Sequence, residues 1–95
     1  MKHAAVVHVK IAVDSDVDHR HSVLHDYVVP QVKTLSGFLH ATWLNDGAGT
    51  GVCIVVFDTE EHAEKGIMSL IDPGGPPVIS SAIYAVEIET APTPG

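Results

Sequence analysis

The most unusual chemical feature of the sequence is its histidine content, seven imidazoles in 95 residues. His19, His21 and His25 stand close together in a segment rich in aspartate. On a helix, His21 and His25 share one face at a spacing that lets two rings reach one metal ion. His19, however, points about 160° away from His21, and no distant third ligand is identifiable. We therefore predict no metal site and interpret the segment as the solvated, acidic start of a helix.

Two histidines and two aromatic residues are candidates for a binding pocket. His21 falls on the predicted core-facing stripe of the first helix, and His8 falls on a strand that is otherwise apolar. Each is either a core residue with a fixed partner or an acid, base or ligand contact in a pocket. Trp43 and Tyr84 lie on edge strands, where packing and ligand stacking are both open.

We expect the pocket to lie between the sheet and the helices. The predicted pocket candidates are polar or aromatic side chains on these elements: His8, His21, His25, Trp43 and Tyr84. No catalytic residue is assigned.

Other chemistries lack the residues they need. The glycines at 47, 49 and 51 lead into a strand and not a helix, so they supply no phosphate-binding helix start. The single Cys53 has no basic neighbour in sequence, which predicts an inert thiol. The lack of spaced cysteines excludes a zinc ribbon. No serine or cysteine nucleophile motif is present. We predict no cofactor.

The elements that position these residues follow from hydrophobic periodicity. Continuous or alternating apolar patterns predict four strands, at residues 4–13, 38–45, 52–57 and 78–89. The first helix spans about His19 to Leu35, with a kink at Pro30 and a C-cap at Gly37. A second helix opens at Asp58, which with Glu61 has the spacing of a capping box.

The order of these elements predicts an α+β, ferredoxin-like β-α-β-β-α-β domain. The first and third strands are apolar on both faces and should be central, which gives an antiparallel sheet of order 4-1-3-2 with both helices on one face. The opposite face would then expose apolar side chains, at about 25 cal/mol per Å². Pairing two sheets face to face removes that cost, so we expect a homodimer.

Composition narrows the range of partners. Twelve acidic residues against five Lys and Arg give a formal charge of −7. Neither nucleic acid nor an anionic membrane suits such a surface. No apolar run reaches the length of a membrane span, and the N-terminus lacks a signal-peptide pattern, so we expect a cytoplasmic protein. Residues 1–90 should form one domain, and residues 91–95 a disordered tail.

Two stretches carry a resemblance to a known family. Val28 to Leu44, with its Gly37-Phe38 step into a strand, and Val55 to Glu64, with Phe57-Asp58-Thr59-Glu60-Glu61-His62-Ala63 entering a helix, resemble antibiotic-biosynthesis-monooxygenase-like domains of the dimeric α/β-barrel superfamily. The resemblance covers roughly residues 4 to 90. It implies a dimeric barrel and either a cofactor-independent monooxygenase-like protein or a binder of a small apolar or aromatic molecule. The alternative is a non-catalytic homodimeric module.

Overall fold

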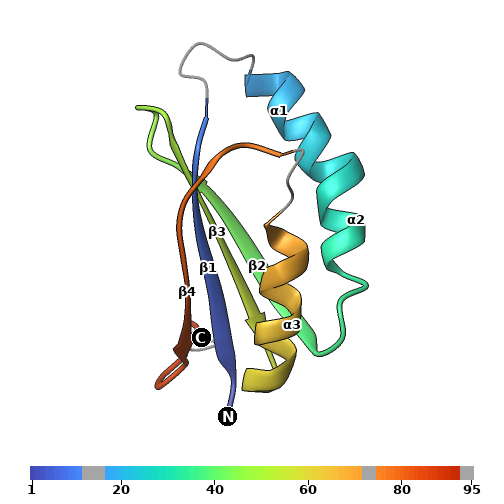
Figure 1. Ribbon diagram of the computed structural model, residues 1–95, viewed down its shortest axis with the longest axis vertical. Helices are drawn as coiled ribbons and strands as arrows, with labels where there is room; N and C mark the ends of the chain where they lie inside the picture. The colour runs from blue at the N-terminus through green and yellow to red at the C-terminus, as the bar shows by residue number, and fades with distance from the viewer. Residues whose placement is uncertain (12–16, 72–74, 93–95) are drawn as a thin grey trace.

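The computed structural model describes residues 1–11, 17–71 and 75–92. Four strands form one antiparallel sheet: β1 (His3–Lys10), β2 (Phe38–Asn45), β3 (Thr50–Phe57) and β4 (Val78–Ala85). Their order is β2-β3-β1-β4, so the predicted sheet order and the two central strands are confirmed. The helical segments lie together along one side of the sheet (Figure 1).

The first helical stretch contains an irregular turn. It runs through α1 (Val17–Val23), the π-helical η1 (Leu24–Val28) and α2 (Val29–Val32). Pro30 has no N–H to donate to the carbonyl of Asp26, and directly before it the N–H of Val29 bonds to the carbonyl of Leu24, five residues back. The predicted disturbance therefore takes the form of a widened turn.

The predicted end of the first helix and the predicted start of the second helix need correction. The first helix ends at Val32, and tight backbone bonds from Thr34 to Gln31 and from Leu35 to Val32 close it. Gly37 is consequently not its cap, although its φ of 77° serves the turn into β2. In α3 (Glu60–Leu70), the N-cap is Thr59 and not Asp58, because the Thr59 hydroxyl accepts the N–H of His62 at 3.1 Å.

Alternation of side chains divides the sheet into two faces. The helix-facing side supplies the core: Ala5, Val7, Val55 and Phe57 pack with Val32, Ala63 and Ile67 from the helices. The other side, here called the open face, carries the alternate positions: Ala4, Val6, His8, Lys10, His40, Thr42, Leu44, Thr50, Val52, Ile54, Val56, Ser80, Ala82 and Tyr84. No described helix covers the open face.

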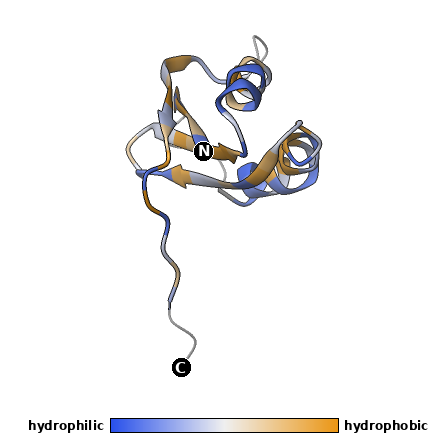
Figure 2. Ribbon diagram, turned by 90° about the horizontal axis from the view of Figure 1, so that it is seen from below, coloured by the Kyte–Doolittle hydropathy of each residue, from blue (hydrophilic) through white to orange (hydrophobic). Residues whose placement is uncertain are grey.

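The last strand is shorter than predicted. It ends at Ala85 instead of continuing to residue 89, and one further backbone bond joins the N–H of Val86 to the carbonyl of Lys2 at 2.9 Å. Beyond this point the chain leaves the sheet, Glu89 contacts Lys2 and His40, and the last described residues run away from the rest of the molecule (Figure 2). We call residues 86–92 the C-terminal arm.

Candidate functional site

The helix-facing side of the sheet has a closed half and a more open half. At the closed half, Val7, Val55 and Phe57 are at most 1% exposed beneath α3 and Val32. Gly66 makes this contact possible, because a Cβ at that position would collide with the Phe57 ring. Side chains fill this half of the sheet and leave no room for a ligand.

At the other half, apolar side chains on the same side of the sheet are only partly covered. Val9, Trp43 and Cys53 come from three neighbouring strands, and Trp43 lies directly across from Cys53. We call these three residues the upper sheet surface. Burial raises the pKa of the Cys53 thiol to about 11, so the group is a neutral, weakly polar part of an apolar surface at neutral pH.

The long helix beside this surface is loosely attached. Val32 is its one buried residue among the described side chains of α1, η1 and α2, with Val28 partly buried one turn earlier. No described side chain of α1 is buried. The end of the helix nearest Pro30 therefore holds it to the core, and no described side chain of α1 belongs to the core cluster.

His21 lies exposed and not on the buried stripe that helical periodicity predicts. The π turn explains the difference. A π turn contains one more residue than an α-turn, which shifts the face of every preceding position by about 100° relative to Val28 and Val32. A count at constant periodicity across η1 thus assigns His21 to the wrong side of the helix.

The remaining predicted pocket residues lie on different surfaces. Trp43 is on the helix-facing side, whereas His8 and Tyr84 are on the open face, His8 half-buried and Tyr84 58% exposed. His25 is exposed on η1, where its Nδ1 lies 3.0 Å from Asp26 Oδ1. Within one chain the sheet thus separates His8 and Tyr84 from the side that carries Trp43 and the long helix.

His62, which is not among the predicted pocket residues, has a well-defined environment at the start of α3. His62 Nδ1 lies 2.6 Å from Asp58 Oδ1, and the Asp58 N–H donates to the Gly37 carbonyl at 2.9 Å. The hydrogen bond from His62 is the main cause that lowers the pKa of Asp58. Gly37 is required because a Cβ there would collide with both side chains. The i, i+4 spacing of Asp58 and His62 was the available sequence signal.

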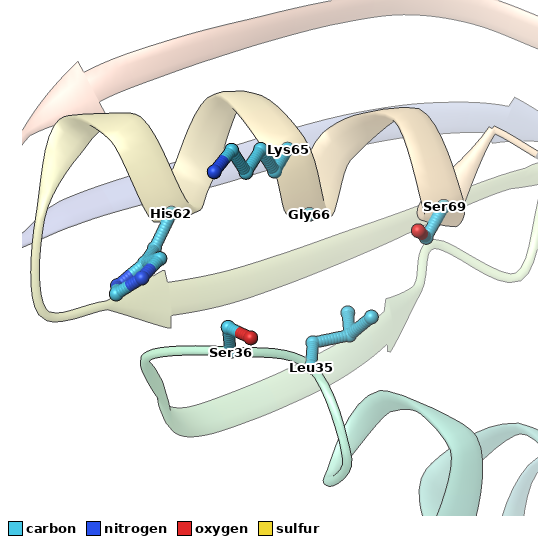
Figure 3. Close-up of a pocket in the computed structure, with 6 residues that line it drawn as sticks. All are labelled: Leu35, Ser36, His62, Lys65, Gly66 and Ser69. Atoms are coloured by element: carbon cyan, nitrogen blue, oxygen red, sulfur yellow. The ribbon is translucent and has the colours of Figure 1, made fainter.

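His62 also borders a hollow of about 150 Å³ between α3 and the turn before β2. Figure 3 shows it between the helix and the Leu35–Ser36 segment. Its other lining residues are Lys65, Gly66 and Ser69. Lys65 is engaged with Glu61 at 3.2 Å, so the hollow offers hydroxyls and one imidazole edge.

Two features are absent from the described ranges. Over residues 1–11, 17–71 and 75–92, no group of three or more His, Cys, Asp or Glu is arranged to hold a metal ion. Over the same residues, no helix combines the length and the apolar character that crossing a bilayer requires.

Comparison with known proteins identifies the fold. No protein-family model and no curated protein sequence matches the chain. Among solved structures, the chain is similar to the monooxygenase from the gene ActVA-Orf6 of Streptomyces coelicolor in complex with nanaomycin D, with a TM-score of 0.60, 18% identity and coverage of 96% of this chain and 92% of that one. The chain has the ferredoxin-like α+β fold of these structures, which agrees with the resemblance at the level of the fold.

Two other solved structures match this chain over nearly the full length of both chains. SnoaB, a cofactor-independent oxygenase from Streptomyces nogalater, has a TM-score of 0.63 at 13% identity and covers 97% of this chain and 98% of its own. Rv0793 from Mycobacterium tuberculosis has a TM-score of 0.64 at 13% identity and covers 96% and 100%. At these identities the comparison establishes the architecture and assigns no residue a role.

Proposed function

We propose that the protein is a homodimer that binds a small, largely apolar or aromatic molecule between the upper sheet surface and the long helix, in the manner of a cofactor-independent oxygenase. The observation that carries the proposal is the uneven cover of the helix-facing side. Val9, Trp43 and Cys53 stay partly exposed, whereas Phe57 on the same side of the sheet is fully buried. Partly exposed apolar groups beside a loosely held element are typical of a binding surface.

The chemistry of this surface favours binding over proton transfer. Its described groups are an aliphatic side chain, an indole and a thiol whose pKa of about 11 keeps it protonated. An indole provides a flat face on which an aromatic ligand can stack. A base for catalysis would have to come from another element, and His21, the candidate that the sequence supplied, is exposed and lies off the core-facing side of the long helix.

The proposal is tested directly by the fluorescence of Trp43, the only tryptophan in the chain. Nanaomycin D, the ligand of one structural neighbour, is a suitable probe. We expect saturable quenching of Trp43 emission, and we expect Cys53→Phe to weaken it by at least about tenfold because the added ring occupies the surface. Met68→Phe is the matched control, since Met68 is 72% exposed on α3. Quenching that does not saturate, or that Cys53→Phe leaves unchanged in a folded variant, contradicts a site at this surface.

The oxygenase part requires a separate measurement. Without a cofactor, the electrons that reduce O2 must come from the substrate, so an electron-rich hydroxylated aromatic is the appropriate class. A phenol with a free para position and one O2 give a quinone and one water, which balances all atoms and electrons. We expect one O2 consumed per quinone formed, measured with an oxygen electrode and by absorbance. Saturable binding with no O2 uptake supports the alternative, a non-catalytic binding module.

The homodimer is supported by the open face. Val6, Val52 and Ile54 lie on the open face of the two central strands, which no described helix covers, and Leu44 is 50% exposed beside them. Pairing two such faces buries this surface, at about 25 cal/mol per Å². Sedimentation equilibrium should give twice the 10.1 kDa chain mass. A single species at the chain mass, at micromolar concentration, contradicts the dimer.

A further inference from the structure

The hollow beside α3 contains three polar groups that form no hydrogen bond within the described chain. Nδ1 of His62 is held by Asp58, whereas Nε2 of the same ring has no partner among the described residues. The hydroxyls of Ser36 and Ser69, which line the same hollow, likewise make no hydrogen bond within residues 1–11, 17–71 and 75–92. In Figure 3 the side chains of His62 and Ser69 extend from α3 toward the Leu35–Ser36 segment. The hollow therefore has hydrogen-bonding groups that a ligand can use.

The contact with Asp58 determines whether the other ring nitrogen donates or accepts. A carboxylate only accepts hydrogen bonds, and Asp58, whose pKa is lowered, is ionised at neutral pH. The hydrogen between the two side chains is therefore on Nδ1 of His62, which lies 2.6 Å from Asp58 Oδ1. A neutral imidazole carries one ring hydrogen, so Nε2 keeps a lone pair and accepts. This nitrogen consequently selects a ligand that donates a hydrogen, such as a hydroxyl group.

The rest of the lining favours a ligand that is small, neutral and mostly apolar. Leu35 and Gly66 contribute no polar side-chain atom. Lys65 is paired with Glu61 at 3.2 Å, so no unpaired ammonium among the lining residues attracts an anion, and the formal charge of −7 disfavours one further. A hollow of about 150 Å³ has room for a ring the size of benzene. The ligand therefore has a body of about six carbon atoms.

We propose that this hollow is a second binding site, which takes a small neutral alcohol. The hydroxyl of the alcohol donates to Nε2 of His62, and its aliphatic part lies against Leu35 and Gly66. Asp58 is a positioning residue, because it holds the imidazole in the tautomer that accepts the hydrogen bond.

The alcohol site is separate from the upper sheet surface. Ser36 lines the hollow two residues before β2 begins at Phe38, and Trp43 lies five residues further along the strand. At about 3.3 Å per residue, Phe38 and Trp43 are roughly 16 Å apart. An aliphatic alcohol also has no aromatic ring to stack on Trp43. The alcohol site therefore does not depend on the proposed function.

The test compares cyclopentanol with cyclopentyl methyl ether, which has the same ring but no hydrogen to donate. Binding is followed by NMR of the ¹⁵N-labelled full chain at pH 8, through the His62 ring nitrogens, the Gly66 amide and the Trp43 indole. Cyclopentanol should shift the His62 and Gly66 signals saturably, with a dissociation constant of about 10 mM or below, and leave the Trp43 signal unchanged. The ether should bind at least about fivefold more weakly, because it leaves Nε2 without a partner.

Three variants locate the site through the Gly66 amide. His62→Leu removes the acceptor and should abolish the preference for the alcohol over the ether. His25→Leu is the matched control, because Nδ1 of His25 also lies 3.0 Å from a carboxylate, that of Asp26, but His25 is on η1 and does not line this hollow. It should change the binding of either ligand by less than about twofold. Ser69→Leu, at an exposed position of α3, fills the hollow and should weaken both ligands by at least about fivefold.

Any of four other outcomes would overturn the alcohol site. Equal binding of the alcohol and the ether would mean that Nε2 takes no part. Ring ¹⁵N shifts that place the hydrogen on Nε2 in the free protein would mean that Asp58 does not hold the accepting tautomer. Tighter binding of cyclopentanecarboxylate would mean that the hollow selects an anion. A shift of the Trp43 signal alone would place the alcohol at the upper sheet surface. If His62→Leu does not fold, Ser69→Leu and the wild-type comparison of alcohol with ether still decide.

Discussion

The two helical segments on one side of the sheet, α3 and the long helix, are attached to it by different contacts. Helix α3 begins at a defined cap, Thr59, and buries Ala63, Gly66 and Ile67 against fully buried strand residues. The long helix from α1 to α2 has a π turn in its middle and buries Val32 among its described side chains. The difference separates stability from binding. The half of the sheet beneath α3 is fully covered by side chains. The half beside the long helix leaves apolar side chains partly exposed, so that a ligand can contact them.

The largest effect should come from removing the side chain at the centre of the complete half. Phe57 is fully buried and contacts α3 at Gly66. Phe57→Ala should lower the free energy of unfolding by about 3–5 kcal/mol, because the cavity it leaves is enclosed on all sides. Urea denaturation measures this change. A loss below about 1 kcal/mol would mean that this half can collapse around the cavity, so it would not be the rigid part of the molecule.

A smaller effect is expected from adding a methyl group at the contact between helix and sheet. The Cβ of Gly66→Ala would collide with the Phe57 ring, so the helix must move outward or the ring must leave its position. Overpacking of this kind costs about 1–3 kcal/mol, more than the gain in helix propensity of up to about 1 kcal/mol. Ser69→Ala, on an exposed position of the same helix, is the control and should be nearly neutral. Stabilisation by Gly66→Ala would show that α3 is not packed tightly.

Asp58, just before α3, should make the stability of the fold depend on acidic pH. We expect this effect to be detectable but smaller than that of either core substitution. Hydrogen bonding to His62 lowers the pKa of Asp58 in the folded state. A depressed carboxyl pKa contributes stability that is present above the unfolded value of about 3.9 and is lost as the pH falls through the lower folded value. Asp58→Asn should therefore reduce stability at pH 7 and flatten its decline below about pH 4. Thermal melts from pH 7 to pH 2.5 provide the measurement, and identical pH profiles for the two proteins would contradict the assignment.

The comparison of the two halves also explains which parts of the structure the sequence could predict. Strand order followed from the apolar character of residues 4–13 and 52–57, since central strands must be covered on both faces. The face of His21 could not be derived, because the effect of Pro30 on helix phase depends on whether the chain breaks, bends or widens there. Glu89 contacts Lys2 and His40, which lie 87 and 49 positions before it in the chain. No local sequence pattern predicts contacts between residues so far apart.

The smallest effect on stability should come from the long helix, at the histidine that the sequence singled out. His21 is exposed, and it lies on the side of the π turn away from Val32, so its ring contributes little to the core. His21→Leu should change the free energy of unfolding by less than about 0.5 kcal/mol, as exposed substitutions usually do. Its value is as a probe of function, because a stable variant separates ligand contact from packing. Because the π turn directs His21 away from the core-facing side, the variant should keep both its melting temperature and its affinity for the quenching probe. A loss of affinity in a stable variant would show that the His21 ring reaches the ligand. A loss of 1 kcal/mol or more in stability would instead mean that the first turns of the long helix are packed as tightly as α3, and the distinction between a stable half and a binding half would fail.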